Sequence, residues 1–419
     1  MSASQLVSAF GVVGILFLAW LFCRHRGAVN WRTVVWGTLL QFVFALLILK
    51  TAPGQWLFLK ANDAVVTLIA FQEEGAKFVF SSLAIPPGEP GSMGFFFAFQ
   101  VLTTIIFLSS LMSALYYLGV MERVVLFFGR IMQYSCRTSG AETLNAAANI
   151  FMGQTEAPLM VRPHIEEMTD SEILCVMVAG MATISAGVLV AYVAMLRPYF
   201  PDVAGHLIAA QVMGACGSLV IAKLMLPETG RPKTQGNLAL AYKDPSSGVI
   251  EAAASGAEVG LRLALNVGAM LVAFMSLLAM VNWGVHHLCA LLGADIGLEQ
   301  LFGWAFSPLA WLMGVPWKDC LTVGSLIGEK TVLNEFVAYT NMSRYLAAHA
   351  GALEPRSIVI ASHALCGFAN LLSIGIQIGG IGVLAPSRRP DLARLGIYAL
   401  IGGSLASFMN AAIVGVLVR

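Results

Sequence analysis

Charged residues are the scarcest class in this chain. Only 11% of its 419 residues are Asp, Glu, Lys or Arg, whereas 58% are hydrophobic. Soluble globular domains carry about 25% charged residues, so this composition excludes a soluble globular protein and favours one embedded in a membrane. The net charge of +1 lacks the basic excess that nucleic acid binding needs. Nucleic acid is therefore not expected among the partners.

Patterned metal and disulfide motifs are missing too. The seven cysteines are scattered without a CxxC pair, and the seven histidines show no HExxH spacing. This spacing predicts neither a disulfide framework nor a metal cluster. A basic segment before the first hydrophobic run is also absent, while Arg24 and Arg26 lie beyond that run. The pattern predicts a retained first helix with its N-terminus outside, rather than a cleaved signal peptide.

Long hydrophobic stretches are what the chain has in abundance. A helix needs about 20 mostly apolar residues to cross a hydrocarbon core of about 30 Å. The stretches that meet this requirement are roughly 5–23, 34–52, 93–120, 172–195, 205–226, 258–284, 357–383 and 396–418. If the N-terminus is outside, eight spans put four loops in the cytoplasm: 24–33, 121–171, 223–262 and 384–395. These loops hold 15 of the 24 Lys and Arg residues, Lys243 among them, as the positive-inside rule expects.

Two further hydrophobic regions are too short to cross the membrane. Residues 141–152 would form a helix of about 18 Å, with Arg137 before it and Arg162 after its return arm. Basic residues at both ends predict a re-entrant hairpin at about 141–165. A second hairpin is predicted at about 315–345, entering from the opposite side. Spans 172–195 and 357–383 each contain small and polar residues in mid-span, which predicts that both helices are interrupted.

The two halves of the chain repeat the same order of elements. Each has a long span, a surface helix, a short hairpin with a glutamate near its tip, an interrupted span and a final span. Inverted repeats with broken helices are a recurring plan of secondary transporters. We therefore predict an all-α integral membrane protein with eight transmembrane helices and two opposed re-entrant hairpins. Its expected parts are 1–92 (N-terminal transmembrane helices and an extracellular excursion), 93–226 (first repeat unit), 227–257 (cytoplasmic linker) and 258–419 (second repeat unit).

Polar side chains gather at the predicted hairpin tips. Gln154, Thr155 and Glu156 follow one another inside an apolar segment, between Gly153 and Pro158. An ionisable group at membrane depth costs about 2.5–3.5 kcal/mol on insertion scales, so it marks a candidate functional site. The alternative is a structural role for these side chains, with Glu156 paired to Arg162 and the amide and hydroxyl bonding across helices.

The second hairpin and the second interrupted span supply matching groups. Glu335 lies near the second tip, and Phe368, Asn370 and Ser373 lie in the interruption. Carboxylates and amides without an obvious intramembrane Arg suit a neutral solute rich in hydrogen-bond donors. The structural alternatives are an ion pair of Glu335 with Lys330 or Arg344, packing by Phe368, and bonding of Ser373 to its own helix.

An ion site is predicted beside the first tip. Asn149 and Thr183 supply neutral oxygens, and the breaks at Met152 and at Thr183 and Ile184 supply carbonyls. Hard cations take oxygen ligands, and unwound helix ends bind sodium or protons in such folds. The alternative is ordinary hydrogen bonding at a helix break.

Three ordered segments, residues 149–158, 334–339 and 366–370, strongly resemble the concentrative nucleoside transporter family. The resemblance runs over nearly the whole length, from residues 32–35 through 116–121 to 384–389. It implies a bacterial member that forms a homotrimer in the inner membrane. In each protomer a transport domain would slide past a scaffold, which is an elevator form of alternating access.

The resemblance also implies roles for individual residues. Nucleobase contacts fall to Gln154, Thr155, Glu156 and Val188. Ribose contacts fall to Glu335, Asn370 and Ser373, with Phe368 beside the ligand. Sodium would be held by Asn149, Thr183 and the carbonyls of Met152 and Ile184. Two positions depart from the family pattern, since Thr183 stands where Ser is expected and Leu372 replaces a Ser beside Ser373.

The predicted function is sodium-coupled symport of nucleosides such as uridine, with sodium as the coupling ion and no chemistry on the solute. Proton coupling through Glu156 or Glu335 is the alternative within the same class. A membrane enzyme that acts on a lipid-linked sugar is the alternative from another class. A channel is disfavoured because no ring of like charges is predicted along a pore.

Overall fold

The computed structural model describes residues 3–87, 89–236, 246–291 and 296–418. Within these ranges the secondary structure is helical, apart from a single bridge between Ser139 and Gln235. Residues 237–245 of the predicted cytoplasmic linker, including Lys243, lie outside the described ranges. Seven of the described helical segments are long and apolar enough to cross a membrane. The eighth predicted span, 357–383, is present as two shorter helices.

The helices fall into three groups along the chain. The first group is α1 (Ala3–Leu21), α2 (Trp31–Lys50), α3 (Ala52–Phe80), α4 (Phe97–Gln100) and α5 (Leu102–Tyr117). The second is α6 (Val120–Cys136), α7 (Gly140–Ala148), α8 (Asp170–Ala182), α9 (Ala186–Leu196) and α10 (Val203–Met225). The third is α11 (Val249–Leu291), α12 (Leu298–Leu312), α13 (Cys320–Val332), α14 (Glu335–Ala348), α15 (Pro355–Leu365), α16 (Leu371–Leu384) and α17 (Arg389–Leu417). The 3₁₀ segments are η1 (Arg26–Ala28), η2 (Ser81–Ala84), η3 (Ala157–Glu167), η4 (Trp317–Asp319) and η5 (Pro386–Arg388).

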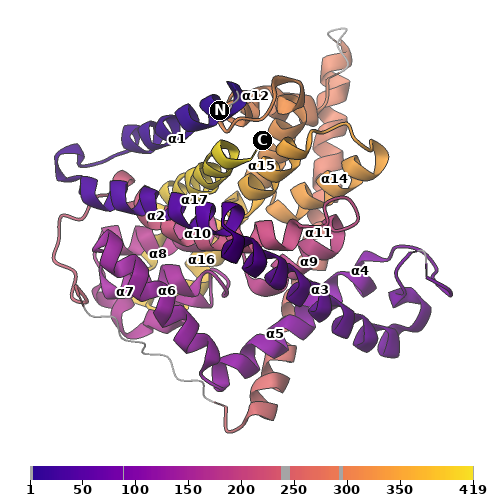
Figure 1. The fold of residues 1–419 in the computed structure, drawn as a ribbon, viewed down its shortest axis with the longest axis horizontal. Coiled ribbons are helices and arrows are strands. Elements are labelled where there is room, and N and C mark those ends of the chain that lie inside the picture. Colours follow the sequence, from indigo (N-terminus) through magenta and orange to yellow (C-terminus); the bar gives the residue numbers. More distant parts are fainter. Residues whose placement is uncertain (1–2, 88, 237–245, 292–295, 419) are drawn as a thin grey trace.

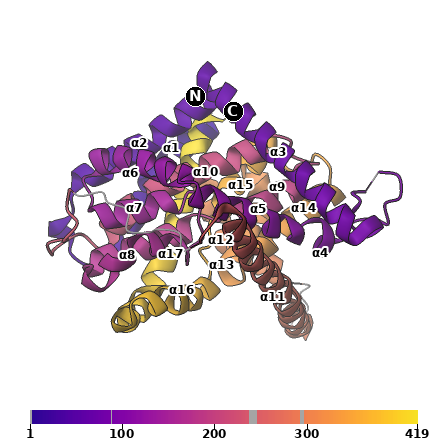
Figure 2. The same ribbon diagram turned by 90° about the horizontal axis from the view of Figure 1, so that it is seen from below.

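The region expected as an extracellular excursion, residues 53–92, is mostly one helix. Helix α3 spans 29 residues, and the Thr51 side chain caps it by accepting from the Gly54 backbone N–H. Most of the Pro and Gly residues that suggested an irregular segment, such as Pro86, Pro87 and Pro90, lie beyond its C-terminal end. Pro53 is in the first turn, where proline fits a helix without losing a hydrogen bond. Figure 2 shows α3 and α4 reaching out from the body of the molecule on one side.

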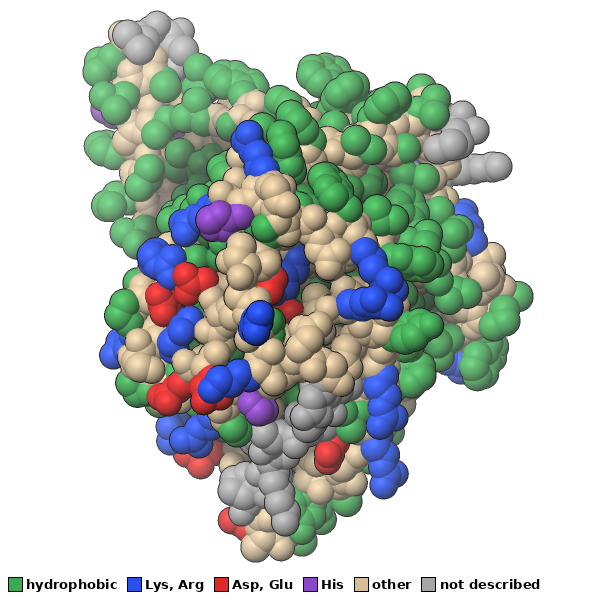
Figure 3. All heavy atoms as spheres, turned by 90° about the vertical axis from the view of Figure 1, so that its left-hand side faces the viewer, with side chains coloured by type: hydrophobic (Ala, Val, Ile, Leu, Met, Phe, Trp, Pro, Cys, Tyr) green, Lys and Arg blue, Asp and Glu red, His purple; other side chains and the backbone are tan. Residues whose placement is uncertain are grey.

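The loops predicted to be cytoplasmic meet at one end of the bundle. The backbone N–H of Arg24 donates to the Met225 carbonyl at 3.1 Å, and its guanidinium lies 4.2 Å from the centre of the Tyr398 ring. Arg394 forms an ion pair with Asp170 at 2.7 Å. Figure 3 shows charged side chains across the middle and lower part of one face, while hydrophobic side chains dominate its upper part and its right edge. This separation of charge from apolar surface is what a membrane-spanning bundle requires.

The opposite end of the bundle holds both ends of the chain, which lie close together in Figure 1. The buried guanidinium of Arg356, in the first turn of α15, ties them together. It donates to five acceptors, the carbonyls of Ser4, Gly314, Gly415 and Val418 and the hydroxyl of Ser8.

We expect Arg356→Met to lower the thermal stability of the purified protein strongly. The substitution keeps an unbranched apolar stem but leaves several buried acceptors without their charged donor, each worth about 1.5–3 kcal/mol. The measurement is the unfolding midpoint in detergent, and a fall of about 5 °C or more is expected. Arg123→Met is the control, because Arg123 is exposed. Equal midpoints for the two variants would contradict the role given to Arg356.

Two helical hairpins start from opposite ends of this bundle. The first pairs α7 with η3, and an ion pair between Glu142 and Lys223 at 2.7 Å fixes its base. Its return arm is 3₁₀ rather than α, and Pro163 inside it lacks the N–H that a continuous α-helix would need there. The second pairs α13 with α14. Its base is fixed by Asp319, which accepts from the Ser357 hydroxyl at 2.5 Å, at the end that holds the termini.

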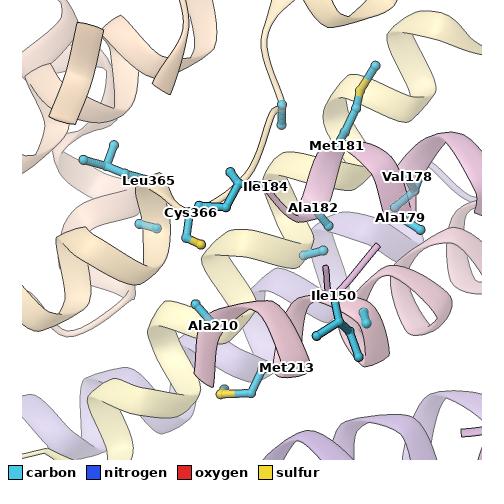
Figure 4. Packing of buried hydrophobic residues seen from close by; sticks show 14 of the residues in the cluster. Ile150, Val178, Ala179, Met181, Ala182, Ile184, Ala210, Met213, Leu365 and Cys366 are labelled. Atoms are coloured by element: carbon cyan, nitrogen blue, oxygen red, sulfur yellow. The ribbon is translucent and has the colours of Figure 1, made fainter. Parts of the chain in front are cut away.

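Both interrupted spans are broken where the sequence predicts. Helix α8 ends at Ala182 and α9 begins at Ala186, while α15 ends at Leu365 and α16 begins at Leu371. The two breaks touch, since the Phe368 backbone N–H donates to the Thr183 carbonyl at 3.1 Å. Figure 4 shows Ile184 and Cys366 near each other on these two segments. A Cβ on Gly367 would lie 2.8 Å from the Met181 carbonyl oxygen, so the close crossing requires glycine there.

Candidate functional site

A cavity of about 150 Å³ lies where the two hairpin tips meet the two helix breaks. All eight residues predicted to contact substrate line it, namely Gln154, Thr155, Glu156, Val188, Glu335, Phe368, Asn370 and Ser373. The cavity has an apolar wall from α11, formed by Leu263, Val267, Met270 and Leu271. Polar groups from both repeat units therefore line one cavity, together with an apolar wall.

Glu335 is the first residue of α14 and is 5% exposed. One carboxylate oxygen accepts from the Tyr192 hydroxyl at 2.9 Å, and the other accepts from the Asn370 side-chain amide at 3.0 Å. The Asn370 side-chain oxygen caps α16 by accepting from the Ser373 backbone N–H at 2.9 Å. The orientation of Asn370 is thus fixed at both ends. It holds the carboxylate of one hairpin against the break of another span.

Hairpin 1, the α7–η3 hairpin, contributes groups that are less fully paired. The Glu156 carboxylate accepts from the Gly153 backbone N–H at 3.2 Å. The Gln154 amide nitrogen donates to the Ser373 hydroxyl at 3.1 Å, which links this tip to α16. The Gln154 side-chain oxygen is buried and has no hydrogen-bond partner among the described residues. It is available to a donor on a bound solute.

The structure does not show the ion pairs that were the structural alternatives for Glu156 and Glu335. In the described part of the chain neither Glu156 nor Glu335 has an ion-pair partner within 4.0 Å. Arg162 is exposed, away from the cavity lining. Lys330 donates instead to the Ala364 carbonyl at 2.7 Å. Two carboxylates thus face the cavity with only neutral hydrogen-bond donors beside them.

Sequence reasoning missed two polar residues of the site. Ser185 is 8% exposed, its hydroxyl has no partner within the described ranges, and it also lines a neighbouring cavity of about 280 Å³. Tyr192 orients Glu335. Ser185, Val188 and Tyr192 are spaced at three and four residues, so they share one face of α9. That spacing was the available signal, because Val188 had already been assigned to the site.

The predicted sodium ligands lie where hairpin 1 meets the first break. The two segments are joined by the Ala186 backbone N–H, which donates to the Phe151 carbonyl at 3.0 Å. Asn149 is fully buried, and its side-chain oxygen has no partner in the described residues. Such an orphaned neutral oxygen fits a hard cation. The Thr183 hydroxyl donates to the Ala179 carbonyl, which leaves its oxygen able to accept a cation.

The other two predicted ligands are backbone carbonyls. Met152 is buried at the hairpin tip. Ile184 is already engaged, because its carbonyl accepts from the Gln211 amide nitrogen and its N–H donates to the Gln211 oxygen at 2.9 Å. A carbonyl has two lone pairs, so this bond leaves room for one more contact. The residues present fit a sodium ion held by neutral oxygens.

Comparison with protein families gives three matches that cover most of the chain. Residues 10–83 match the model described as "Na+ dependent nucleoside transporter N-terminus". Residues 98–199 match a model described as "Nucleoside recognition", and residues 206–415 match "Na+ dependent nucleoside transporter C-terminus".

Individual proteins align over similar lengths. The chain is 43% identical to an uncharacterized transporter of Haemophilus influenzae, over 99% of this chain and 98% of that protein. It is 41% identical to the uncharacterized transporter YutK of Bacillus subtilis, over 97% and 98%. It is 40% identical to sodium/nucleoside cotransporter 1 of Rattus norvegicus over 99% of this chain, but it spans only 64% of the rat protein.

Solved structures share the fold. A structure of CNTnw in an inward-facing substrate-bound state superposes with a TM-score of 0.90 at 43% identity, covering 98% of both chains. A CNTnw variant in an intermediate state gives a TM-score of 0.92 at 42% identity, covering 100% of both chains.

Proposed function

Because the chain belongs to the family of Na+-dependent nucleoside transporters, we propose that it imports nucleosides such as uridine across a bacterial inner membrane, using the sodium gradient. Proteins of this family are transporters rather than enzymes, and sodium is their coupling ion. The observation that carries the proposal is the shared cavity. It brings all eight predicted substrate contacts together from two hairpins and two broken spans.

The cavity suits the two chemical parts of a nucleoside. Glu335 and Asn370 offer paired acceptors and donors to the ribose hydroxyls, and charge-assisted hydrogen bonds of this kind are the stronger class. Gln154, Thr155 and Glu156 present a polar edge to the base. Phe368 and the α11 wall cover apolar faces of the solute. Each buried polar group left unmatched would cost about 1–3 kcal/mol, so solutes without both parts bind poorly.

Sodium coupling follows from the position of the proposed ion site. Asn149 and Met152 belong to the same tip as Gln154 and Glu156, all within residues 149–156. An ion that joins this tip to Thr183 orders the segment that reads the base. Solute binding then depends on sodium because both need the same conformation of the tip.

Transport by an elevator movement of a homotrimer completes the proposal. Helix α11 is 43 residues long, or about 65 Å, roughly twice the membrane crossing distance. Only 6% of the residues in its most apolar stretch are buried. The helix packs along α5. This large apolar surface fits contact with lipid and with two further copies of the chain. The hairpins would re-enter the bilayer from opposite faces, with the N-terminus outside.

The test is counterflow of labelled uridine in vesicles that contain the purified protein. We expect accumulation only in sodium, recovery of chemically unchanged uridine, and competition by other nucleosides. Accumulation in sodium-free buffer that follows a pH gradient would replace sodium by protons. A modified product would replace transport by catalysis, and equilibration without counterflow would indicate a channel.

A further inference from the structure

Lys330 is a buried basic residue that the proposed substrate and sodium sites do not use. It lies in the last turn of α13, in the second hairpin, and its side chain is fully buried. The ammonium group has no carboxylate within ion-pair distance in the described part of the chain. An ammonium buried without a counter-charge is costly, so the site that holds it needs strong compensating contacts.

The compensation comes from the carbonyl end of α15. A helix leaves its last four carbonyls without internal partners, and its dipole is negative at that end. The Lys330 ammonium donates to the Ala364 carbonyl at 2.7 Å, one residue before α15 ends, and lies 5.6 Å from the centre of the Phe408 ring. Tyr339, in the other arm of the hairpin, donates to the Ser362 carbonyl at 2.6 Å. Both arms are thereby bound to the broken end of α15.

The first repeat unit has the same parts without the fixed cation. Its broken span, α8, ends at Ala182. The tip of hairpin 1, which also contains Asn149, lies against that end, since a Cβ on Gly180 would come within 2.8 Å of the Gln154 Cβ. Asn149 is neutral, and its buried oxygen lacks a partner in the described residues. The basic side chain of this hairpin's return arm, Arg162, is exposed. One carbonyl end is therefore closed by a covalently attached amine, whereas Arg162 does not reach the other.

We propose that the Lys330 ammonium is a tethered cation that does at the second hairpin what sodium does at the first. It joins the hairpin to the carbonyl end of a broken helix and so positions Glu335, five residues later, against Asn370. Lys330 is a positioning residue in this proposal, which rests on the proposed sodium-coupled function. Sodium then orders only the tip of hairpin 1, while Lys330 holds the second hairpin in the same position against α15 with or without sodium.

Two substitutions separate the charge from the packing. Lys330→Met keeps most of the volume and removes the charge, and we expect uridine to bind about tenfold more weakly at saturating sodium. Lys330→Asn removes the charge, opens space and adds a neutral oxygen, which lets sodium reach the α15 carbonyls. We expect its Hill coefficient for sodium in uridine binding to rise from about one toward two. Thermal stabilisation by sodium without nucleoside should become steeper in the same variant.

Lys318→Met is the matched control, because Lys318 precedes the same hairpin and its side chain is 63% exposed. The control should keep the uridine affinity and the sodium dependence of the unmodified protein. The proposal is wrong if Lys330→Asn shows the unmodified Hill coefficient and the unmodified sodium stabilisation. The sodium stabilisation of Lys330→Asn tests the proposal even if Lys330→Met fails to fold. If uridine binding to the unmodified protein did not depend on sodium, the proposed function itself would be wrong.

Discussion

Glu335→Gln is expected to abolish uridine uptake and to weaken uridine binding by at least about a hundredfold, or about 2.7 kcal/mol. Both carboxylate oxygens accept hydrogen bonds, from Tyr192 and from Asn370. Glutamine places an NH₂ group where one acceptor stood, so a donor faces a donor in a buried site. Hydrogen bonds to a charged group are worth about 1.5–3 kcal/mol each, and those to the ribose hydroxyls would weaken together.

The measurement is the initial rate of sodium-driven uridine uptake, together with equilibrium binding to the purified variant. Glu329→Gln is the matched control, since Glu329 is also a buried glutamate of the second hairpin. It accepts from Asn341 at 2.9 Å and does not line the substrate cavity. We expect the control to transport and both variants to assemble normally. Unmodified uptake by Glu335→Gln would remove this residue from the site.

The breaks and the hairpins were predictable because membrane depth makes polar and helix-breaking residues informative. Polar residues are rare where water is absent, so runs such as 182–187 and 366–373 stand out against an apolar background. The structure breaks both spans within these runs. The same reasoning singled out Glu156 and Glu335 as candidate site residues, since a carboxylate at a hairpin tip is costly at membrane depth unless it faces a cavity or a binding partner.

Features that depend on the path of the chain in space were not predictable in this way. Lys330 lies five residues from Glu335, which suggested an ion pair. The hairpin turns between them at Leu333 and Asn334, and the lysine points to α15. Proximity in sequence does not imply contact across a turn. Ser185 carried only the weak signal of its spacing from Val188, and the cavity that it lines together with Glu156 identifies it.

Asn149→Ala and Thr183→Ala should each raise the sodium concentration needed for half-maximal uridine uptake by about tenfold or more. Each substitution removes one neutral oxygen from the proposed ion site, and one ligand of a hard cation is worth at least about 1.4 kcal/mol of affinity. The Asn149 oxygen has no hydrogen-bond partner within the described residues. Asn149→Ala therefore removes one bond that the structure shows, which the amide nitrogen donates to the Asn145 carbonyl at 2.9 Å. The maximal rate at saturating sodium should change less, because the nucleoside contacts remain.

The control is Thr143→Ala, which removes another buried hydroxyl from hairpin 1. That hydroxyl donates to the Ser139 carbonyl at 2.6 Å, at the base of the hairpin and away from its tip. We expect a loss of stability in this variant with an unchanged sodium requirement. A shift in sodium dependence confined to Asn149→Ala and Thr183→Ala would place the ion between the tip and the break. If those two variants instead kept the sodium requirement of the unmodified protein, the coupling ion would have to bind elsewhere, and the open carbonyl end of α8 would have only a structural role.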